Sequence, residues 1–382
     1  MPLIASLTRA RFGLLTGSAL FLLSCGSGDA AMMAKEPSVV RAGPSLRLDW
    51  TQQLGSSSFA DAHWGLASDH HGGVMVLGQT TTEPPFVRRY DATGSVLWSV
   101  TDTDHPGTIA SDGEGNNFVA GVTTGVVLTK RDLDGGLVWT RPFGPATAER
   151  VIYQGVDDSA HVSVVWNKVP LPRNPEPVPF QVTRTDSAGA DAGTVPGPAV
   201  YLVTMDAGGN LFFVEGAGVY TLTKQDPTGV TLWTRSVTGF VASCATTDRN
   251  GNVLLAGLAG ARDAQLTKLD PDGNLVWSQV FAADGLASPH AVAADAHGNI
   301  TVVGEARDSL FRQNSVLYSD AFIVQYGPDG ESIATLQFGE DLEDDEADQV
   351  AVDDSGAVYV AGRTAMILSQ PDSDVFLKRF VH

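Results

Sequence analysis

The stretch LDPDGNLVW, residues 269–277, joins a turn rich in aspartate and glycine to an apolar strand that ends in tryptophan. Copies of it read YDATGSVLW (90–98), RDLDGGLVW (131–139), QDPTGVTLW (225–233) and, more weakly, YGPDGESIA (326–334). Aspartate before glycine favours a hairpin, because aspartate can bond the turn backbone and glycine accepts a positive φ. The chain therefore repeats a hairpin whose second strand carries tryptophan.

A second D-x-x-G turn alternates with the first and precedes an apolar strand, as in NVLLAG (252–257) and NITVVG (299–304). Its aspartates are separated by 42 to 58 residues, and they are Asp69, Asp112, Asp157, Asp206, Asp248, Asp295 and Asp353. One repeat thus holds four antiparallel strands joined by short turns. Four-stranded units of this period are typical of propeller blades, which bury their faces against neighbouring blades.

Seven such turns predict an all-β fold, a seven-bladed β-propeller over residues 46–382. The last blade stops after its third strand at DVFLKRFVH (374–382), and LRLDWTQQLG (46–55) matches the tryptophan strand of other blades. We therefore expect the first and last strands to pair and close the ring, which removes exposed sheet edges. The third blade departs most, because its copy near 185–193 has lost the tryptophan.

Three segments carry a resemblance to a known family: AQLTKLDPDGNLVW (264–277), AVAADAHGNITVVG (291–304) and QVAVDDSGAVYVAG (349–362). They resemble the repeats of the bacterial seven-bladed β-propeller (SBBP-type) lipoproteins. The resemblance implies the fold and supplies no catalytic motif. YDATGSVLW (90–98) is also similar, more distantly, to the repeat of PQQ-like propellers. Those propellers include quinoprotein dehydrogenases and an outer-membrane assembly lipoprotein. The dehydrogenase activity would need a vicinal cysteine pair, which this sequence lacks.

The N-terminus predicts export. Arg9 and Arg11 precede the short apolar run FGLLTGSALFLLSC (12–25), which is typical of a signal peptide. Its end, LLSC, resembles a lipobox, so we expect residues 1–24 to be removed, Cys25 to carry lipid and residues 25–45 to tether the domain. The alternative is an ordinary signal peptide with a chance cysteine. Gly26 after the lipidated residue favours the outer membrane or the cell surface.

The charge restricts the partners. The formal net charge is −20, and loss of Arg9 and Arg11 with the signal peptide takes it to −22. A strongly acidic domain argues against nucleic acid and against an anionic membrane surface, so we expect membrane contact through the lipid alone. Cys244 would be the one remaining cysteine, and its strand-like surroundings predict a buried residue. We expect a monomer.

Polar residues near the start of each innermost strand are the candidate binding site. Counted back from the turn aspartates, they are His63, Trp64, His105, Arg150, Tyr201, Ser243, His290 and Asp348. In a propeller these positions ring the mouth of the central channel, where ligands commonly bind. The alternative is the ordinary polar lining of a wet channel.

Long insertions fall on the face opposite the D-x-x-G turns, at 167–179, 305–320 and 339–349. Loops on a rigid scaffold often carry binding function. The acidic run in the last insertion is a candidate cation site, with Ca²⁺ the candidate ion, and otherwise a solvated loop. Its residues are Asp341, Glu343, Asp344, Asp345 and Glu346. The D-x-x-G turns lack the ligand spacing of a calcium loop, and the sequence requires no cofactor.

These observations predict a non-enzymatic, lipid-anchored propeller of the cell envelope. It would bind an envelope or extracellular protein, or a saccharide, through its loop-rich face and channel mouth. Two alternatives stay open: a hydrolase or lyase acting on saccharide or peptide at the channel mouth, and a scaffold for protein assembly in the envelope. No residue is assigned a catalytic role.

Overall fold

A computed structural model of the chain shows the arrangement of its strands. The described residues all belong to one compact unit, 37–382. They are 46–54, 62–80, 83–101, 106–122, 125–143, 150–167, 179–200, 202–215, 220–237, 239–259, 263–282, 287–307, 319–339, 343–366 and 373–382. The predicted signal peptide, Cys25 and the tether lie outside them. No helix within these ranges is long and apolar enough to cross a bilayer.

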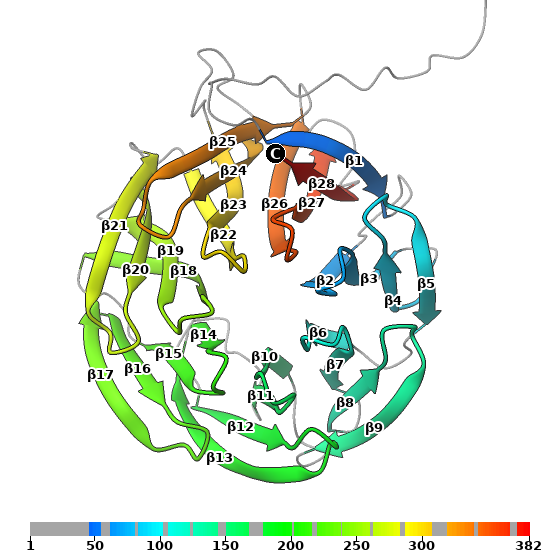
Figure 1. Ribbon diagram of the computed structural model, residues 1–382, viewed down its shortest axis with the longest axis vertical. Coiled ribbons are helices and arrows are strands. Elements are labelled where there is room, and N and C mark those ends of the chain that lie inside the picture. The colour runs from blue at the N-terminus through cyan, green and yellow to red at the C-terminus, as the bar shows by residue number, and fades with distance from the viewer. Residues whose placement is uncertain are drawn as a thin grey trace, which may run out of the picture. The chain divides into compact units, whose positions relative to one another are not determined.

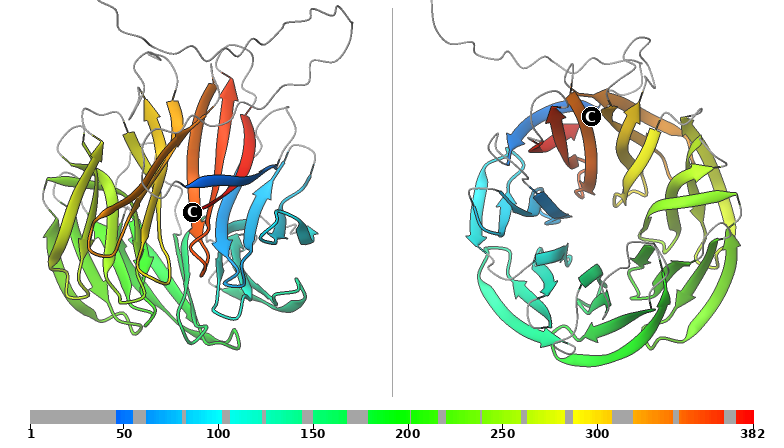
Figure 2. Two further views of the ribbon diagram at one scale, coloured as in Figure 1. Left: turned by 45° about the horizontal axis from the view of Figure 1, so that its top comes forward. Right: turned by 180° about the vertical axis from the view of Figure 1, so that it is seen from behind.

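The described strands form seven four-stranded antiparallel sheets arranged as blades around a central channel, which confirms the predicted propeller (Figures 1 and 2). Blades 1 to 3 are β2 (Ala62–Ser68), β3 (Val74–Gln79), β4 (Phe86–Tyr90), β5 (Val96–Thr101); β6 (Pro106–Ser111), β7 (Asn117–Val122), β8 (Val126–Arg131), β9 (Leu137–Phe143); and β10 (Arg150–Val156), β11 (Val162–Asn167), β12 (Pro179–Thr185), β13 (Asp191–Ala199). Blades 4 and 5 are β14 (Leu202–Met205), β15 (Leu211–Glu215), β16 (Tyr220–Gln225), β17 (Thr231–Val237); and β18 (Phe240–Thr247), β19 (Val253–Ala259), β20 (Asp263–Leu269), β21 (Leu275–Ala282). Blades 6 and 7 are β22 (Ala287–Ala294), β23 (Ile300–Arg307), β24 (Ser319–Tyr326), β25 (Ser332–Phe338); and β26 (Glu343–Val352), β27 (Val358–Met366), β28 (Ser373–Val381) with β1 (Arg47–Gln53).

The N-terminal strand closes the ring, as predicted. β1 pairs antiparallel with β28 from Arg47 opposite Val381 to Gln53 opposite Phe376. The ladder continues past the strand, because the Leu54 amide donates to the Val375 carbonyl at 2.8 Å. Blade 7 is therefore built from both ends of the domain, and its outermost strand comes from the start of the chain.

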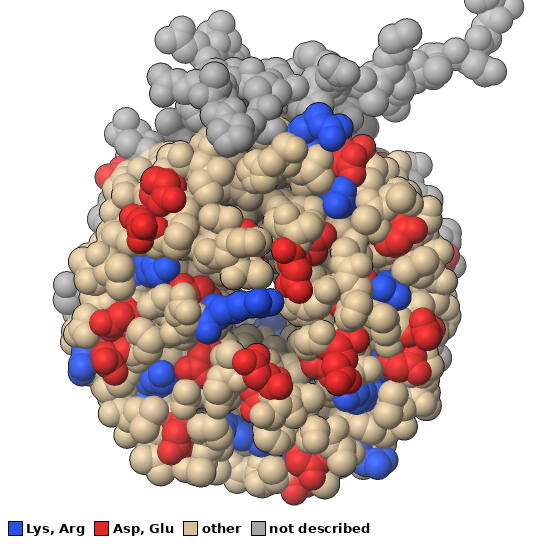
Figure 3. All heavy atoms as spheres, in the orientation of Figure 1, with Lys and Arg blue, Asp and Glu red and all other residues tan. Residues whose placement is uncertain are grey.

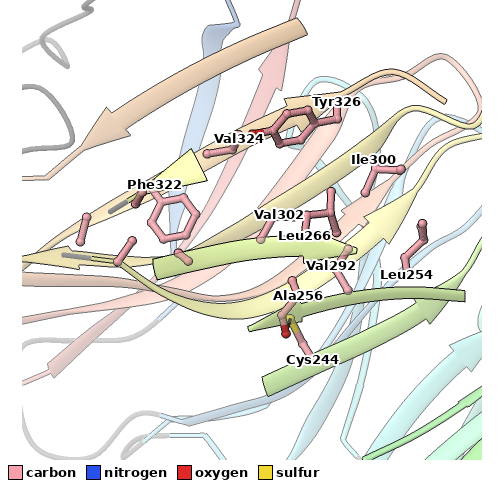
Figure 4. Close-up of a cluster of buried hydrophobic side chains, with 14 residues drawn as sticks. Cys244, Leu254, Ala256, Leu266, Val292, Ile300, Val302, Phe322, Val324 and Tyr326 are labelled. Atoms are coloured by element: carbon pink, nitrogen blue, oxygen red, sulfur yellow. Dashed lines mark hydrogen bonds between the residues drawn. The ribbon is translucent and has the colours of Figure 1, made fainter. Parts of the chain in front are cut away.

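The core lies between the blades. One cluster joins Leu266 of blade 5 to Val302 and Phe322 of blade 6, all with 0% exposure (Figure 4). Each sheet thus buries both faces against its neighbours, and the removal of apolar surface from water stabilises the ring. Cys244 belongs to the same cluster and is 7% exposed, which confirms the predicted burial.

The quoted stretch forms the predicted hairpin turn. Gly273 has a φ of +80° and its amide donates to the Asp270 carbonyl at 2.9 Å. The Asp270 carboxylate accepts bonds from the amides of Asp272 at 3.0 Å and Asn274 at 2.8 Å. Asp270 therefore caps its own turn, which explains why aspartate recurs at the first position.

Four tryptophans each connect a blade to the next one. The indole Nε1 of Trp277 in blade 5 donates to the Pro328 carbonyl in blade 6 at 3.0 Å, and Trp233 donates to the Pro271 carbonyl at 3.1 Å. The indole rings lie against the turn glycines: a Cβ on Gly330 would be 3.0 Å from Trp277. Trp50 and Trp98 make the same indole bond.

Buried ion pairs inside the blades were not predicted. Lys268, on the third strand of blade 5, places its Nζ 3.1 Å from the carboxylate of Asp248, and both side chains are at most 6% exposed. The same Nζ donates to the Pro328 carbonyl of blade 6 at 3.1 Å. Equivalent pairs are Arg89–Asp69, Lys130–Asp112 and Lys224–Asp206. Each pair links the inner turn of a blade to its third strand.

Candidate functional site

The innermost strands share a β-bulge, which decides where the predicted mouth residues point. In six of the seven innermost strands, within the described ranges, the pairing register shifts around one unpaired residue. Those residues are Trp64, Gly107, Ile152, Ser243, His290 and Asp348, each five residues before the turn aspartate of its blade. A bulge redirects the side chain beside it, so these positions are the equivalent ones around the channel.

This register corrects part of the predicted ring. Arg150 begins β10 and pairs with Asn167, two residues before the bulge, so it is not equivalent to His290. Its side chain is exposed, and Ser243 is the exposed bulge residue of blade 5. Residues 105 and 201 lie outside the described ranges. His63 and Trp64 lie within β2, and their side chains belong to the part not described.

Two of the predicted residues come together. The Nδ1 atom of His290 on β22 lies 3.6 Å from Oδ1 of Asp348 on β26, across the boundary between blades 6 and 7. Arg363 on β27 donates from Nε to Oδ2 of Asp348 at 3.0 Å and from a terminal nitrogen to Oε2 of Glu346 at 2.6 Å. We call His290, Glu346, Asp348 and Arg363 the seam cluster.

In the seam cluster His290, Glu346 and Asp348 are partly buried, whereas Arg363 is exposed, and their charges influence one another. Asp348 raises the pKa of His290 and outweighs the lowering by burial, with further contributions from Glu305 and Glu346. Burial lowers the pKa of the Arg363 guanidinium, while Asp348 and Glu346 raise it more strongly. A histidine beside a carboxylate can act as a general base or a metal ligand. The seam cluster therefore provides a candidate general base or metal ligand at one place on the channel wall.

The acidic run is a strand rather than a loop, which corrects the prediction for residues 343–349. Successive side chains of a strand point to opposite faces, so the acidic side chains are divided between the two faces of β26. Asp345 is 1% exposed and accepts from the Thr364 hydroxyl at 2.5 Å, whereas Asp344 accepts from the Ser319 amide at 2.7 Å. Glu346 faces Arg363, and residue 341 lies outside the described ranges. The predicted cation ligands thus do not share one face.

The opposite mouth of the channel carries a contact that sequence reasoning missed. Asp354, in the inner turn of blade 7, lies 3.3 Å from Arg249 in blade 5 and 3.4 Å from His70 in blade 1. All three are the second residue of a D-x-x-G turn. Aligning the seven turns at this second position would have identified them from the sequence. Figure 3 views this face, with basic side chains over the central opening and acidic ones around it.

His290 is five residues from its turn aspartate, about 16 Å along a strand, so the seam cluster lies toward the other mouth.

Apolar side chains are exposed where several outermost strands begin. Leu275, directly after the quoted turn, is 65% exposed, and Leu137 is 60% exposed. We define the outer belt as Val96, Leu97, Leu137, Val138, Val230, Leu232, Leu275 and Val276, in blades 1, 2, 4 and 5. The strands that carry it are the outer edges of their sheets. No described strand pairs with the outer side of these strands, so apolar surface and a free sheet edge occur together within the described part of the chain.

Comparisons with known proteins support the fold. No protein-family profile matches the chain. The regulatory protein FlaEY of Caulobacter vibrioides is 26% identical over 195 residues, which cover 48% of this chain and 19% of FlaEY. The chain thus matches about a fifth of the length of that relative.

Among solved structures, the Dos1 propeller superposes with a TM-score of 0.51 at 6% identity, covering 88% of this chain and 94% of that one. The C-terminal WD40 domain of Sif2 gives 0.49 at 13% identity, covering 84% of this chain and 83% of that one. BamB from Moraxella catarrhalis gives 0.42 at 15% identity, covering 84% and 86%. At 6% identity the likeness to the Dos1 propeller concerns the fold alone.

Proposed function

We propose that the protein is an exported, lipid-anchored β-propeller that acts as a non-enzymatic scaffold and binds a protein of the cell envelope. The lipobox-like end of the signal segment, Cys25 and Gly26 support the outer membrane or the cell surface as its location. Seven rigid blades present fixed edges and loops in the manner of an interaction platform.

The outer belt is the observation that carries this proposal. Exposed apolar side chains recur at the same place on blades 1, 2, 4 and 5, and exposed apolar surface can mark a protein-binding site. The belt lies on sheet edges, whose unpaired backbone groups can pair with an added strand. We therefore propose that the partner presents an extended segment with apolar side chains. The loops of the predicted loop-rich face lie largely within 168–178, 308–318 and 340–342, outside the described residues. We propose that they also contact the partner.

An exposed residue outside the belt provides the control. His297, beside Asp295 in the inner turn of blade 6, is 70% exposed. The tagged protein is used to capture partners from an envelope extract. We expect Leu232→Glu and Leu275→Glu to lower recovery of a partner at least about tenfold, or about 1.4 kcal/mol, and His297→Glu to leave it unchanged. Equal recovery with all three variants would exclude the belt as the binding surface.

A further inference from the structure

Three side chains of the seam cluster bring potential metal-ligand atoms close together. His290, Glu346 and Asp348 each offer a ligand atom, and these atoms all lie within 4.8 Å of one another. The residues come from neighbouring strands, β22 and β26, of two blades. Two of them are bulge residues, so the backbone irregularity is what brings imidazole and carboxylate face to face.

The distance between His290 and Asp348 suits a shared ion better than a direct bond. Hydrogen bonds between nitrogen and oxygen are about 2.7–3.2 Å long, and the Nδ1–Oδ1 distance is 3.6 Å. Two ligands each about 2.1 Å from a tetrahedral zinc ion are about 3.4 Å apart. The Nδ1 atom is also buried and makes no hydrogen bond to any part of the chain that the structure describes.

Arg363 holds the carboxylates in this arrangement. It contacts Oδ2 of Asp348, whereas the other oxygen, Oδ1, is the one that faces His290. It also contacts Glu346 at 2.6 Å. Groups that orient ligands from behind are a regular part of metal sites. The fixed position of both carboxylates reduces the ordering that an ion would otherwise have to impose.

The charge also suits a divalent cation. Glu346 and Asp348 carry two negative charges, and the single positive charge of Arg363 offsets one of them. With a neutral imidazole the seam cluster therefore has a charge of −1. Imidazole with carboxylates favours zinc and neighbouring transition metals over calcium or magnesium.

We propose that His290, Glu346 and Asp348 bind a transition-metal dication, with Zn²⁺ the best fit, at the boundary between blades 6 and 7. Three protein ligands leave a fourth position for water or for a donor atom of a bound partner. The ion would bridge two blades at the channel wall, so its binding adds a link between them.

Metal titration tests the proposal directly. The protein, purified without a polyhistidine tag and treated with a chelator, is titrated with Zn²⁺ by calorimetry and with Co²⁺ by absorption. We expect one equivalent to bind, with the visible band of a low-coordinate cobalt site. His290→Ala and Asp348→Asn should each weaken binding at least about a hundredfold, as loss of a direct ligand exceeds the 10- to 100-fold effect of losing a supporting group.

The matched control is His297→Ala. His297 also lies beside a carboxylate, 3.9 Å from Asp295, but it is 70% exposed and outside the seam cluster. Its variant should bind zinc like the unaltered protein. Absence of binding by the unaltered protein would overturn the proposal and leave the histidine and aspartate as an ion pair. Binding that survives His290→Ala, or that is equally strong with Ca²⁺, would overturn it as well.

Discussion

The turn glycines make a graded prediction about what holds neighbouring blades together. Gly273 has a φ of +80°, and a Cβ there would lie 2.8 Å from the Arg235 side chain and 2.9 Å from the Trp233 ring of the preceding blade. Gly72 has a similar φ of +88° with nothing within 4 Å of its Cβ position. Gly113 also has open space there, and its φ is not positive. Alanine at the three sites therefore separates backbone strain from the collision with tryptophan.

The magnitudes follow from these differences. Gly113→Ala should change the free energy of unfolding by less than about 0.5 kcal/mol. Gly72→Ala should cost about 1–2 kcal/mol, the cost of a Cβ in the left-handed region. Gly273→Ala adds an overpacking cost of about 1–3 kcal/mol, and we expect a total of about 3 kcal/mol.

Urea unfolding followed by circular dichroism measures all three variants against the unaltered protein. The midpoint should fall in the order Gly113→Ala, Gly72→Ala, Gly273→Ala, with unchanged slope. Equal losses for Gly72→Ala and Gly273→Ala would refute the reasoning, because the contact between turn and tryptophan would then contribute nothing.

Three further predictions concern buried groups. Asn117 is 0% exposed, and its side-chain amide makes no hydrogen bond to the described chain. Asn117→Val removes this unpaired polar group and should raise the free energy of unfolding by about 1–2 kcal/mol. A lower melting temperature of the variant would contradict this. Lys268→Met should cost about 3–5 kcal/mol because it leaves the buried Asp248 carboxylate without its cation, whereas Arg249→Met on the surface should cost below about 1 kcal/mol. Similar urea midpoints for the two variants would contradict this. Burial raises the pKa of Cys244 to about 12, so its thiol should react with Ellman's reagent at pH 8 only on unfolding, and fast reaction in the folded protein would contradict its burial.

The propeller could be predicted because its signals are local and repeated. The D-x-x-G hairpin depends on one aspartate and one glycine within four residues, and four of the seven tryptophans follow such a turn at a constant distance. In the hairpins a short segment determines its own geometry. Ring closure pairs distant segments, and it could be predicted because a fourth strand was missing at one end and a matching strand stood at the other.

The candidate site was harder to predict because it depends on contacts between blades. His290 and Asp348 are 58 residues apart in the chain, and each sits at a bulge that periodicity alone does not reveal. Counting back five residues from each turn aspartate would have selected both and excluded Arg150. The acidic run was mistaken for a loop because its charge concealed a strand whose Asp345 finds a buried partner in Thr364.

Photo-crosslinking in the living cell tests most directly whether the outer belt binds a partner. A photoreactive amino acid is placed at Leu275, at Leu232 or at His297 in the inner turn of blade 6, and the products are identified by mass. We predict adducts with one envelope protein from positions 275 and 232 and none above background from 297. Adducts of equal yield at all three positions, or none at any, would contradict the proposed scaffold.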